Sequence, residues 1–308
     1  MKVLLIRAGA LGDTLMLMPV IAHLRKKAEI VLAGRYPGID YLSPYVDQCI
    51  DYERSGWHGL FMEGAGKNPC RIFPVPDHVA AFLSDRGGRV MENLKAWFPA
   101  ASIHIFPVFP PGKEKIHIAL YMAQSIEAAG LPIDARRCFE DSLKAPLMAG
   151  QASFRGKARI VLHPGSGSTD KNYPTILWLE LINRLKDRYP GKSKRIVLLM
   201  GPAEEGLMSF FREALDEREA ELVLCPEREA FMRLLSQASL FIGHDSGITH
   251  LAAMMGAPVI ALFKKSSQEQ WAPLGPAVKI IRDEKGRSDF IEGIIDQGMR
   301  FLFLCPGG

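Results

Sequence analysis

Short apolar runs alternate with longer amphipathic stretches along most of this chain. The first run, Val3–Ile6, precedes Thr14–Lys27, in which apolar residues recur at helical spacing, and another run follows at Glu29–Ala33. Short apolar runs favour buried strands, and an amphipathic stretch favours a helix. Strands that alternate with helices indicate a doubly wound α/β domain built on a parallel sheet.

The pattern becomes less regular between Gly34 and Lys115, where Cys49–Tyr52 and Ser102–Phe106 predict two short strands. Trp57–Pro76 is rich in Gly and Pro and predicts a long loop, a length that favours a functional or mobile role. Asp134–Lys157 has weak periodicity and contains helix-breaking residues, so it predicts an interdomain linker. We therefore expect an N-terminal domain at residues 1–148 and a C-terminal domain at residues 149–308.

Alternation resumes in the second half of the chain. The expected strands there are Arg159–Leu162, Arg195–Met200, Glu221–Leu224, Leu240–Ile242, Val259–Phe263 and Val278–Ile281. The expected helices are Thr175–Tyr189, Leu207–Leu215, Glu229–Gln237 and Ile248–Met255. A last amphipathic helix, at about 290–303, could pack back on the N-terminal domain.

The turn before Ile248–Met255 is the first candidate for chemistry. It places Ser246 and Gly247 at a helix N-terminus, where free N–H groups and the helix dipole favour an anion such as a phosphate. Thr249 and His250 could add side-chain donors. Ordinary capping by Asp245 or Ser246 explains the same residues, and the turn alone does not separate the two interpretations.

Three loops follow strand ends and should lie on one rim of the second domain. They are His163–Tyr173, Gly201–Glu205 and His244–Gly247. The first offers hydroxyl donors beside the cation of Lys171, a composition that suits a diphosphate, although a flexible surface loop would have the same composition. Glu204 and Glu205 could accept hydrogen bonds from ribose hydroxyls or could simply begin a helix.

Composition sets limits on these hypotheses. The chain has 308 residues, 48% hydrophobic residues and a net charge of +4, typical of a soluble globular protein with two cores. The mild positive charge fits an anionic ligand and is too weak to indicate nucleic acid. Its five scattered cysteines lack zinc spacing, which favours reduced thiols. No apolar run approaches the roughly 20 residues that span a bilayer, so we expect a cytoplasmic protein with no transmembrane segment.

Three motifs together resemble one family. They are R-A-G-A-L-G-D-T-L at Arg7–Leu15, H-P-G-S-G-S-T-D-K-N-Y-P at His163–Pro174 and F-I-G-H-D-S-G-I-T-H-L-A-A at Phe241–Ala253. The chain resembles the bacterial lipopolysaccharide heptosyltransferases of glycosyltransferase family 9. The resemblance implies the GT-B architecture, in which two Rossmann-like doubly wound domains face across a cleft. It also implies inverting transfer of heptose from ADP-heptose to an anionic, lipid-linked inner-core saccharide at the inner membrane surface, where the enzyme could be peripheral.

The resemblance also implies roles for individual residues. Asp13 would be the catalytic base, Lys171 would pair with the donor diphosphate, and Asp245 would hold sugar hydroxyls. Either Glu204 or Glu205 would bind ribose. The remaining donor-binding positions would be Ala10, Gly12, Ser166, Gly167, Ser246, Gly247, Ile248, Thr249 and His250. A helix-capping role for Asp13 is the alternative that its position alone favours.

Two positions depart from the pattern of the family. Lys264-Lys265-Ser266-Ser267 replaces the Gly-Pro that related sequences usually carry after this strand, and Tyr173 stands where many have Trp. The two lysines could meet phosphate or could be surface charge. Neither change removes a proposed catalytic group.

Other functions remain open. A nucleotide-sugar epimerase is also built on paired Rossmann-like domains, and a sugar-nucleotide binding protein without turnover would share the same loops. A nicotinamide oxidoreductase is disfavoured because no strand is followed by G-x-G-x-x-G. No D-x-D pair occurs, so we expect neither an essential metal nor a cofactor beyond the nucleotide sugar. A basic set favours an anionic acceptor: Lys67, Arg71, Lys113 and Lys115.

Overall fold

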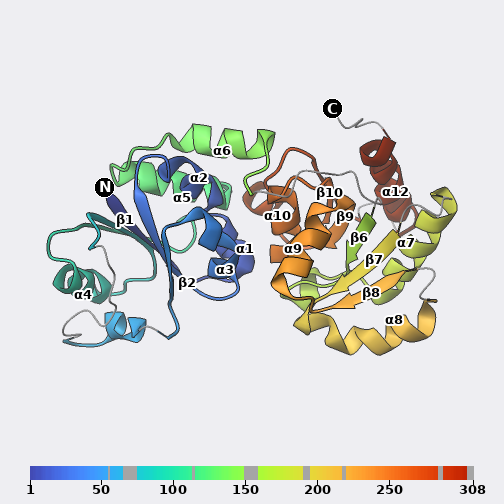
Figure 1. Cartoon of the computed structure of the whole chain (residues 1–308), viewed down its shortest axis with the longest axis horizontal. Coiled ribbons are helices and arrows are strands. Elements are labelled where there is room, and N and C mark those ends of the chain that lie inside the picture. The colour runs from blue at the N-terminus through green and yellow to red at the C-terminus, as the bar shows by residue number, and fades with distance from the viewer. Residues whose placement is uncertain are drawn as a thin grey trace. The chain divides into compact units, whose positions relative to one another are not determined.

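The computed structural model of the chain forms two compact units, Met1–Asp141 and Ser142–Gly308 (Figure 1). It describes residues 1–54, 56–64, 75–112, 115–148, 159–189, 195–216, 220–283 and 287–303. The division falls within helix α6 (Ala135–Lys144), where the sequence predicted a linker. The N–H groups of Leu147 and Met148 both donate to the carbonyl of Met254, so the chain has joined the second unit before the expected boundary at 148/149.

The first unit is built on a five-stranded parallel sheet with the order β3-β2-β1-β4-β5. Its strands are β1 (Lys2–Arg7), β2 (Glu29–Gly34), β3 (Gln48–Asp51), β4 (His78–Phe82) and β5 (Ser102–Phe106). Four of these were expected. The fourth strand, β4, was not, because it follows a Pro-rich stretch and two of its five residues are alanines, which have low strand propensity.

Helices cover both faces of the first sheet (Figure 1). The helices are α1 (Leu11–Leu15), α2 (Met18–Leu24), α3 (Gly38–Leu42), α4 (Arg89–Trp97) and α5 (Ile118–Ala128), with 3₁₀ turns η1 (Ser43–Tyr45) and η2 (Trp57–Phe61). Leu94 and Trp97 of α4 and Trp57 of η2 pack on the side chains of alternate strand residues. The expected helix at Thr14–Lys27 is two helices, since Pro19 lies in the first turn of α2 and cannot continue α1.

The second unit is built on a six-stranded parallel sheet with the order β11-β10-β9-β6-β7-β8. Its strands are β6 (Arg159–His163), β7 (Arg195–Met200), β8 (Glu221–Leu224), β9 (Ala238–His244), β10 (Val259–Leu262) and β11 (Val278–Ile281). All six were expected from the sequence. The change of direction in strand order falls between β6 and β9, the position at which sheets of this type bind ligands.

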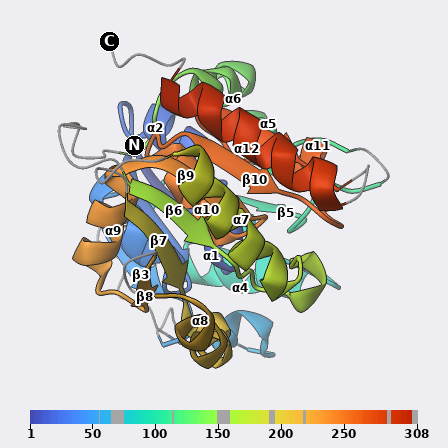
Figure 2. The ribbon, with the colours of Figure 1, turned by 90° about the vertical axis from the view of Figure 1, so that its right-hand side faces the viewer.

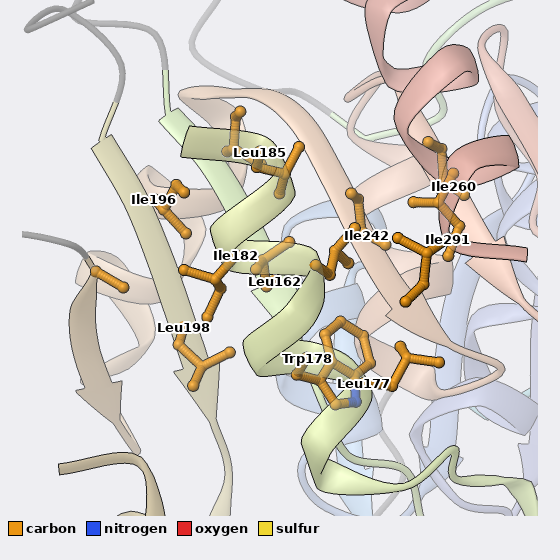
Figure 3. Packing of buried hydrophobic residues seen from close by; sticks show 14 of the residues in the cluster. Leu162, Leu177, Trp178, Ile182, Leu185, Ile196, Leu198, Ile242, Ile260 and Ile291 are labelled. Carbon is orange, nitrogen blue, oxygen red and sulfur yellow. The ribbon is translucent and has the colours of Figure 1, made fainter. Parts of the chain in front are cut away.

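Helices again cover both faces (Figures 1 and 2). They are α7 (Thr175–Arg188), α8 (Met208–Ala214), α9 (Arg228–Ser236), α10 (Gly247–Met254), the short α11 (Gln268–Trp271) and α12 (Arg287–Phe303), with 3₁₀ turns η3 (Thr169–Lys171) and η4 (Pro202–Leu207). In Figure 3, Trp178 and Ile182 of α7 point at Leu162, Leu198 and Ile242 of the sheet. Every residue from Thr249 to Met254 is buried, as expected for a helix that is apolar on nearly all sides.

The final helix, α12, contributes to this same core. Phe290, Ile291, Ile294 and Ile295 are buried in the cluster formed by α7 and the strands of the second sheet, and Ile291 lies next to Ile260 in Figure 3. The apolar face of α12 therefore belongs to the second unit, whereas the sequence suggested packing on the first domain.

Candidate functional site

The carboxyl ends of β6, β7, β9 and β10 carry loops that contact one another. Parallel strands end at the same edge of a sheet, so residues far apart in sequence meet there. Lys171, after β6, reaches Asp245, after β9, and Glu204, after β7, lies against Gly165. The expectation that these loops share a rim is confirmed by these contacts.

Asp245 is the centre of the site. Its Oδ2 accepts a 2.7 Å hydrogen bond from Lys171 Nζ, and its Oδ1 lies 3.5 Å from His250 Nε2. The carboxylate is 4% exposed, while the lysine is 38% exposed. Burial alone would raise the pKa of Asp245, but hydrogen bonds from His250, Lys171 and Ser266 hold the pKa well below the usual range of a carboxyl. Asp245 is therefore an ionised, buried anion that orients a half-exposed cation.

The N-terminus of α10 is formed by an internal hydrogen-bond network. Ser246 is the N-cap, and its Oγ accepts the N–H of Thr249 at 3.3 Å and lies 3.1 Å from Thr249 Oγ1. Thr249 Oγ1 also donates to the carbonyl of His244 at 2.5 Å. The two hydroxyls thus have capping roles in the structure, and Thr249 is fully buried. Gly247 and Ile248 form the partly exposed start of the helix.

The loop after β6 is shaped by Ser166. Its Oγ lies 2.8 Å from the carbonyl of Ser168 and 2.7 Å from Oδ1 of Asn172, and the side chain is 7% exposed. These bonds fold the loop around the short turn that ends at Lys171. The adjacent Gly167 is exposed and faces open space. Ser166 therefore holds the shape of the loop that presents Lys171.

Only one of the two candidate ribose-binding acids lies in this network. Glu204 is 5% exposed, and its Oε2 accepts the N–H of Gly201 at 2.9 Å. A Cβ at Gly165 would collide with the Glu204 carboxylate, so glycine is required for this approach. Glu205 is exposed. Sequence reasoning could not choose between the two, and the structure places Glu204 beside the Lys171 loop.

A buried histidine that sequence reasoning had not selected supports the same loop. His244 Nε2 accepts the N–H of Tyr173 at 2.9 Å, and its ring stacks on Tyr173 and meets the edge of Trp178. Burial, aided by the nearby His163, lowers the pKa of His244 to about 3, so the ring is neutral and can accept. Tyr173 Oη also donates to the carbonyl of Phe263 at 3.0 Å.

In the first unit, Asp13 lies in the first turn of α1. Its Oδ2 accepts the N–H of Ala10, the N-cap residue, at 3.1 Å. Its Oδ1 lies 3.5 Å from Nη2 of Arg7, whose side chain is 1% exposed against 23% for Asp13. Asp13 thus combines a capping contact with an ion pair to a buried cation. The Ala10 N–H, which the resemblance assigned to the donor, is bonded to Asp13 here, and Gly12 sits in the same turn.

Arg7 is held on its other side by the loop after β5. Nη1 donates to the carbonyl of Val108 at 3.0 Å, and the guanidinium lies over the ring of Phe109. Burial lowers the pKa of Arg7, and the charge of Asp13 opposes that effect. A signal for this residue was present in the R-A-G-A-L-G-D motif, but spacing alone did not show that its side chain turns back toward Asp13.

Several expectations concern groups or residues beyond this network. Among the described residues, no three His, Cys, Asp or Glu side chains gather as they would around a metal ion. Within those same ranges, the chain has no helix with the length and apolar character needed to cross a bilayer. Lys115 is exposed, whereas Lys67, Arg71 and Lys113 lie outside the described residues.

Comparisons with known proteins agree with this picture. Residues 111–292 match the profile of glycosyltransferase family 9 (heptosyltransferase). The fold is similar to that of E. coli heptosyltransferase WaaC with ADP, with a TM-score of 0.68 and 16% identity over 96% of this chain and 100% of that one. The fold is also similar to that of E. coli ADP-heptose LPS heptosyltransferase II, with a TM-score of 0.65 and 17% identity over 97% of this chain and 99% of that one.

A Listeria monocytogenes protein described as a putative UDP-N-acetylglucosamine 2-epimerase also shares the fold, with a TM-score of 0.51 and 14% identity over 98% and 90% of the two chains. No curated protein matches the sequence. At these identities the structural likenesses establish a fold, two Rossmann-like units of the GT-B class, and leave substrates open.

Proposed function

We propose, since the chain belongs to glycosyltransferase family 9 (heptosyltransferase), that it transfers a heptose from ADP-heptose to an anionic inner-core saccharide of lipopolysaccharide. Membership of the family makes the chain a glycosyltransferase that uses a nucleotide sugar. The donor sugar, the acceptor and the roles of individual residues are the proposal. The observation that carries it is the Lys171–Asp245–His250 cluster beside the start of α10.

The donor diphosphate would bind where Lys171 meets the N-terminus of α10. The first N–H groups of α10, at Gly247 and Ile248, and the positive end of its dipole favour an anion. Lys171 is 38% exposed, so its ammonium can meet a phosphate oxygen while Asp245 keeps it in place. The leaving diphosphate gains negative charge as the bond to the anomeric carbon breaks, and a cation and dipole fixed in advance stabilise that charge. No metal is then required for this step.

Asp245 and Glu204 would hold the two ends of the donor. Asp245 has two acceptor oxygens, of which Lys171 and His250 each approach one, and ionised carboxylates accept several hydrogen bonds. A sugar hydroxyl can donate to the remaining lone pairs. Glu204 lies beside the same loop and would accept from ribose hydroxyls, with Ser166 and Gly167 shaping the wall between them.

Asp13 would act as the general base in a single displacement. The acceptor hydroxyl attacks the anomeric carbon, its proton passes to the Asp13 carboxylate, and the electron pair of the broken bond leaves with the diphosphate, which inverts the anomeric centre. Arg7 and the Ala10 N–H fix the carboxylate from two sides, and its 23% exposure leaves it accessible. A positioned base of this kind contributes roughly 10²–10⁴-fold.

The test is incubation of the chain with ADP-heptose and a heptose-deficient inner-core acceptor, with mass spectrometry of the lipid product and measurement of released ADP. We expect both to increase together and the new linkage to be inverted. An epimerase, which the fold also accommodates, would alter a nucleotide sugar without any acceptor. Release of ADP without a glycosylated product, or change of the sugar alone, would contradict the proposal.

A further inference from the structure

Three consecutive residues after β10, Lys264–Ser266, contact the Lys171–Asp245 pair and the residues beside it. Lys264 Nζ donates to the carbonyl of Asn172 at 3.0 Å. Lys265 Nζ lies 2.8 Å from the Asp170 carboxylate. The side chain of Ser266 hydrogen-bonds Asp245. We call Lys264–Ser266 the strap.

The strap is itself fixed. The Arg282 guanidinium donates to the carbonyl of Ser266, and the Lys264 ammonium lies 5.8 Å from the centre of the Tyr173 ring, close enough for a cation–π contact. Tyr173 is in turn bonded to Phe263, the residue before the strap. The strap therefore joins the loop after β6 to the end of β10.

The residues that the strap contacts lie on both sides of Lys171. Asp170 and Asn172 are its chain neighbours, and Asp245 is the acceptor of its side-chain hydrogen bond. We propose that Lys264 and Lys265 are positioning residues, which hold Lys171 and Asp245 in place for the donor diphosphate and do not themselves bind phosphate. This inference rests on the proposed function, because it assigns Lys171 to the donor.

The charges and contacts of the two lysines support a positioning role. The Lys265 ammonium is paired with a carboxylate, and the Lys264 ammonium has a carbonyl and an aromatic ring as partners. Direct phosphate binding by Lys265 would have to break its ion pair. The loop that they hold contains Gly165 and Gly167, so ordering it before the donor binds lowers the entropy lost on binding.

The test is a double-mutant cycle on the affinity for ADP, measured by calorimetry. The variants are Lys265→Gln, Asp170→Asn and the double substitution. Both side chains are well exposed, 62% and 72%, and exposed pairs contribute little, so we expect Lys265→Gln to raise the Kd about two- to fivefold. Melting temperatures should stay near that of the parent. The donor KM should rise by a similar factor, with kcat nearly unchanged.

The sign of the coupling decides the outcome. If the strap positions Lys171, Asp170→Asn will raise the Kd for ADP more in the parent than in the Lys265→Gln background. If Lys265 binds phosphate directly, Asp170→Asn releases the Lys265 ammonium from its ion pair. The substitution then lowers the Kd for ADP in the parent but not in the Lys265→Gln background, and the coupling has the opposite sign. Either that sign or strict additivity would overturn the proposal. Lys279→Gln, the same change of charge on β11, is the control and should leave the Kd within twofold.

Failure of the strap and failure of the proposed function give different results. Lys171→Ala tests the donor contact without touching the strap. If Lys171→Ala weakens ADP binding while the Lys265–Asp170 cycle is additive, only the positioning role is lost. If Lys171→Ala leaves ADP affinity unchanged, the assignment of Lys171 to the diphosphate is wrong, and the strap has no donor contact to position.

Discussion

Arg7 and Asp13 pair across the turn that joins β1 to α1, with Nη2 of the arginine 3.5 Å from Oδ1 of the aspartate. The arginine is buried and its Nη1 is bonded to Val108, so Asp13 is a counter-charge for a cation with little access to water. The Asp13 carboxylate therefore has a structural contact in addition to its proposed role as a base. Its effect on stability and its effect on turnover must be measured separately.

Asp13→Asn should lower kcat by at least about 10²-fold, because an amide cannot take the proton of the acceptor hydroxyl. The affinity for ADP should remain close to that of the parent. Single-turnover rates with donor and acceptor, together with calorimetry of ADP, check both expectations. Turnover within a few-fold of the parent in a folded variant would rule out Asp13 as the base.

The same substitution should lower the free energy of unfolding by about 1–3 kcal/mol, since it leaves a buried cation without its anionic partner. Loss of a charge–dipole contact alone would cost only about 0.3–1 kcal/mol. Urea denaturation gives the difference. The double variant Arg7→Met/Asp13→Asn removes both charges and should recover part of the loss. No recovery would mean that Arg7 does not depend on Asp13.

Lys171→Ala should weaken ADP binding, because a cation beside the diphosphate is removed and Asp245 loses the donor of its 2.7 Å hydrogen bond. A charge-assisted hydrogen bond contributes roughly 1.5–3 kcal/mol, which corresponds to an increase in Kd of about tenfold or more. Isothermal calorimetry measures the change, with Lys279→Ala as a control at an exposed lysine. Equal Kd values for parent and Lys171→Ala would return Lys171 to the role of a surface residue.

ADP should raise the melting temperature more than UDP or GDP at equal concentration, an expectation that follows from the family. Stabilisation by a ligand increases as RT ln(1 + [L]/Kd), so the nucleotide that binds best shifts the transition most. A thermal-shift series at several concentrations of each nucleotide checks this. Equal shifts, or none at saturation, would count against an ADP-linked donor.

Stability should fall as pH decreases from about 6.5 toward 3, because His244 stays neutral in the folded protein while the unfolded chain takes up a proton. Burial lowers the pKa of His244 to about 3, below the ordinary value near 6.5. The contribution of neutral His244 to the free energy of unfolding is therefore complete above about pH 6.5. Below that pH it declines by up to about 1.4 kcal/mol per pH unit. The buried His163, whose pKa is also lowered, acts in the same direction.

The measurement is the free energy of unfolding in urea at several pH values. Gln can accept the Tyr173 N–H in place of His244 Nε2 and does not titrate, so His244→Gln should show a shallower slope between pH 6 and 4. His58→Gln, at an exposed position, is the control and should retain the slope of the parent. Equal slopes in all three proteins would show that His244 does not resist protonation.

The sequence predicted elements best where local composition decides the structure. Ser102–Phe106, Arg195–Met200 and Val278–Ile281 are strands with the expected bounds, because each is a short run rich in apolar residues. At the helix Ala135–Lys144 the sequence predicts a linker instead, because charged residues dominate this stretch and only a few positions are apolar.

The site shows a similar limit. The motifs located Lys171, Asp245 and Asp13 in loops after strands, but they did not show that Lys171 and Asp245 bind each other, or that Arg7 turns back to Asp13. Side-chain direction depends on the packed neighbours of a residue, such as Val108 and Phe109 beside Arg7, which lie far away in the sequence. The sequence therefore predicted which loops carry the candidate functional residues, whereas it did not predict the contacts that each side chain makes.

The strand order of the second unit has a consequence for how it folds during synthesis. β6 is made first and β7 and β8 add on one side of it, after which β9, β10 and β11 add on the other side in the order of translation. Each new strand therefore leaves the ribosome with a neighbour already present. The apolar face that α12 covers must wait for Arg287–Phe303, so nascent chains stalled before this helix should expose that face to chaperones.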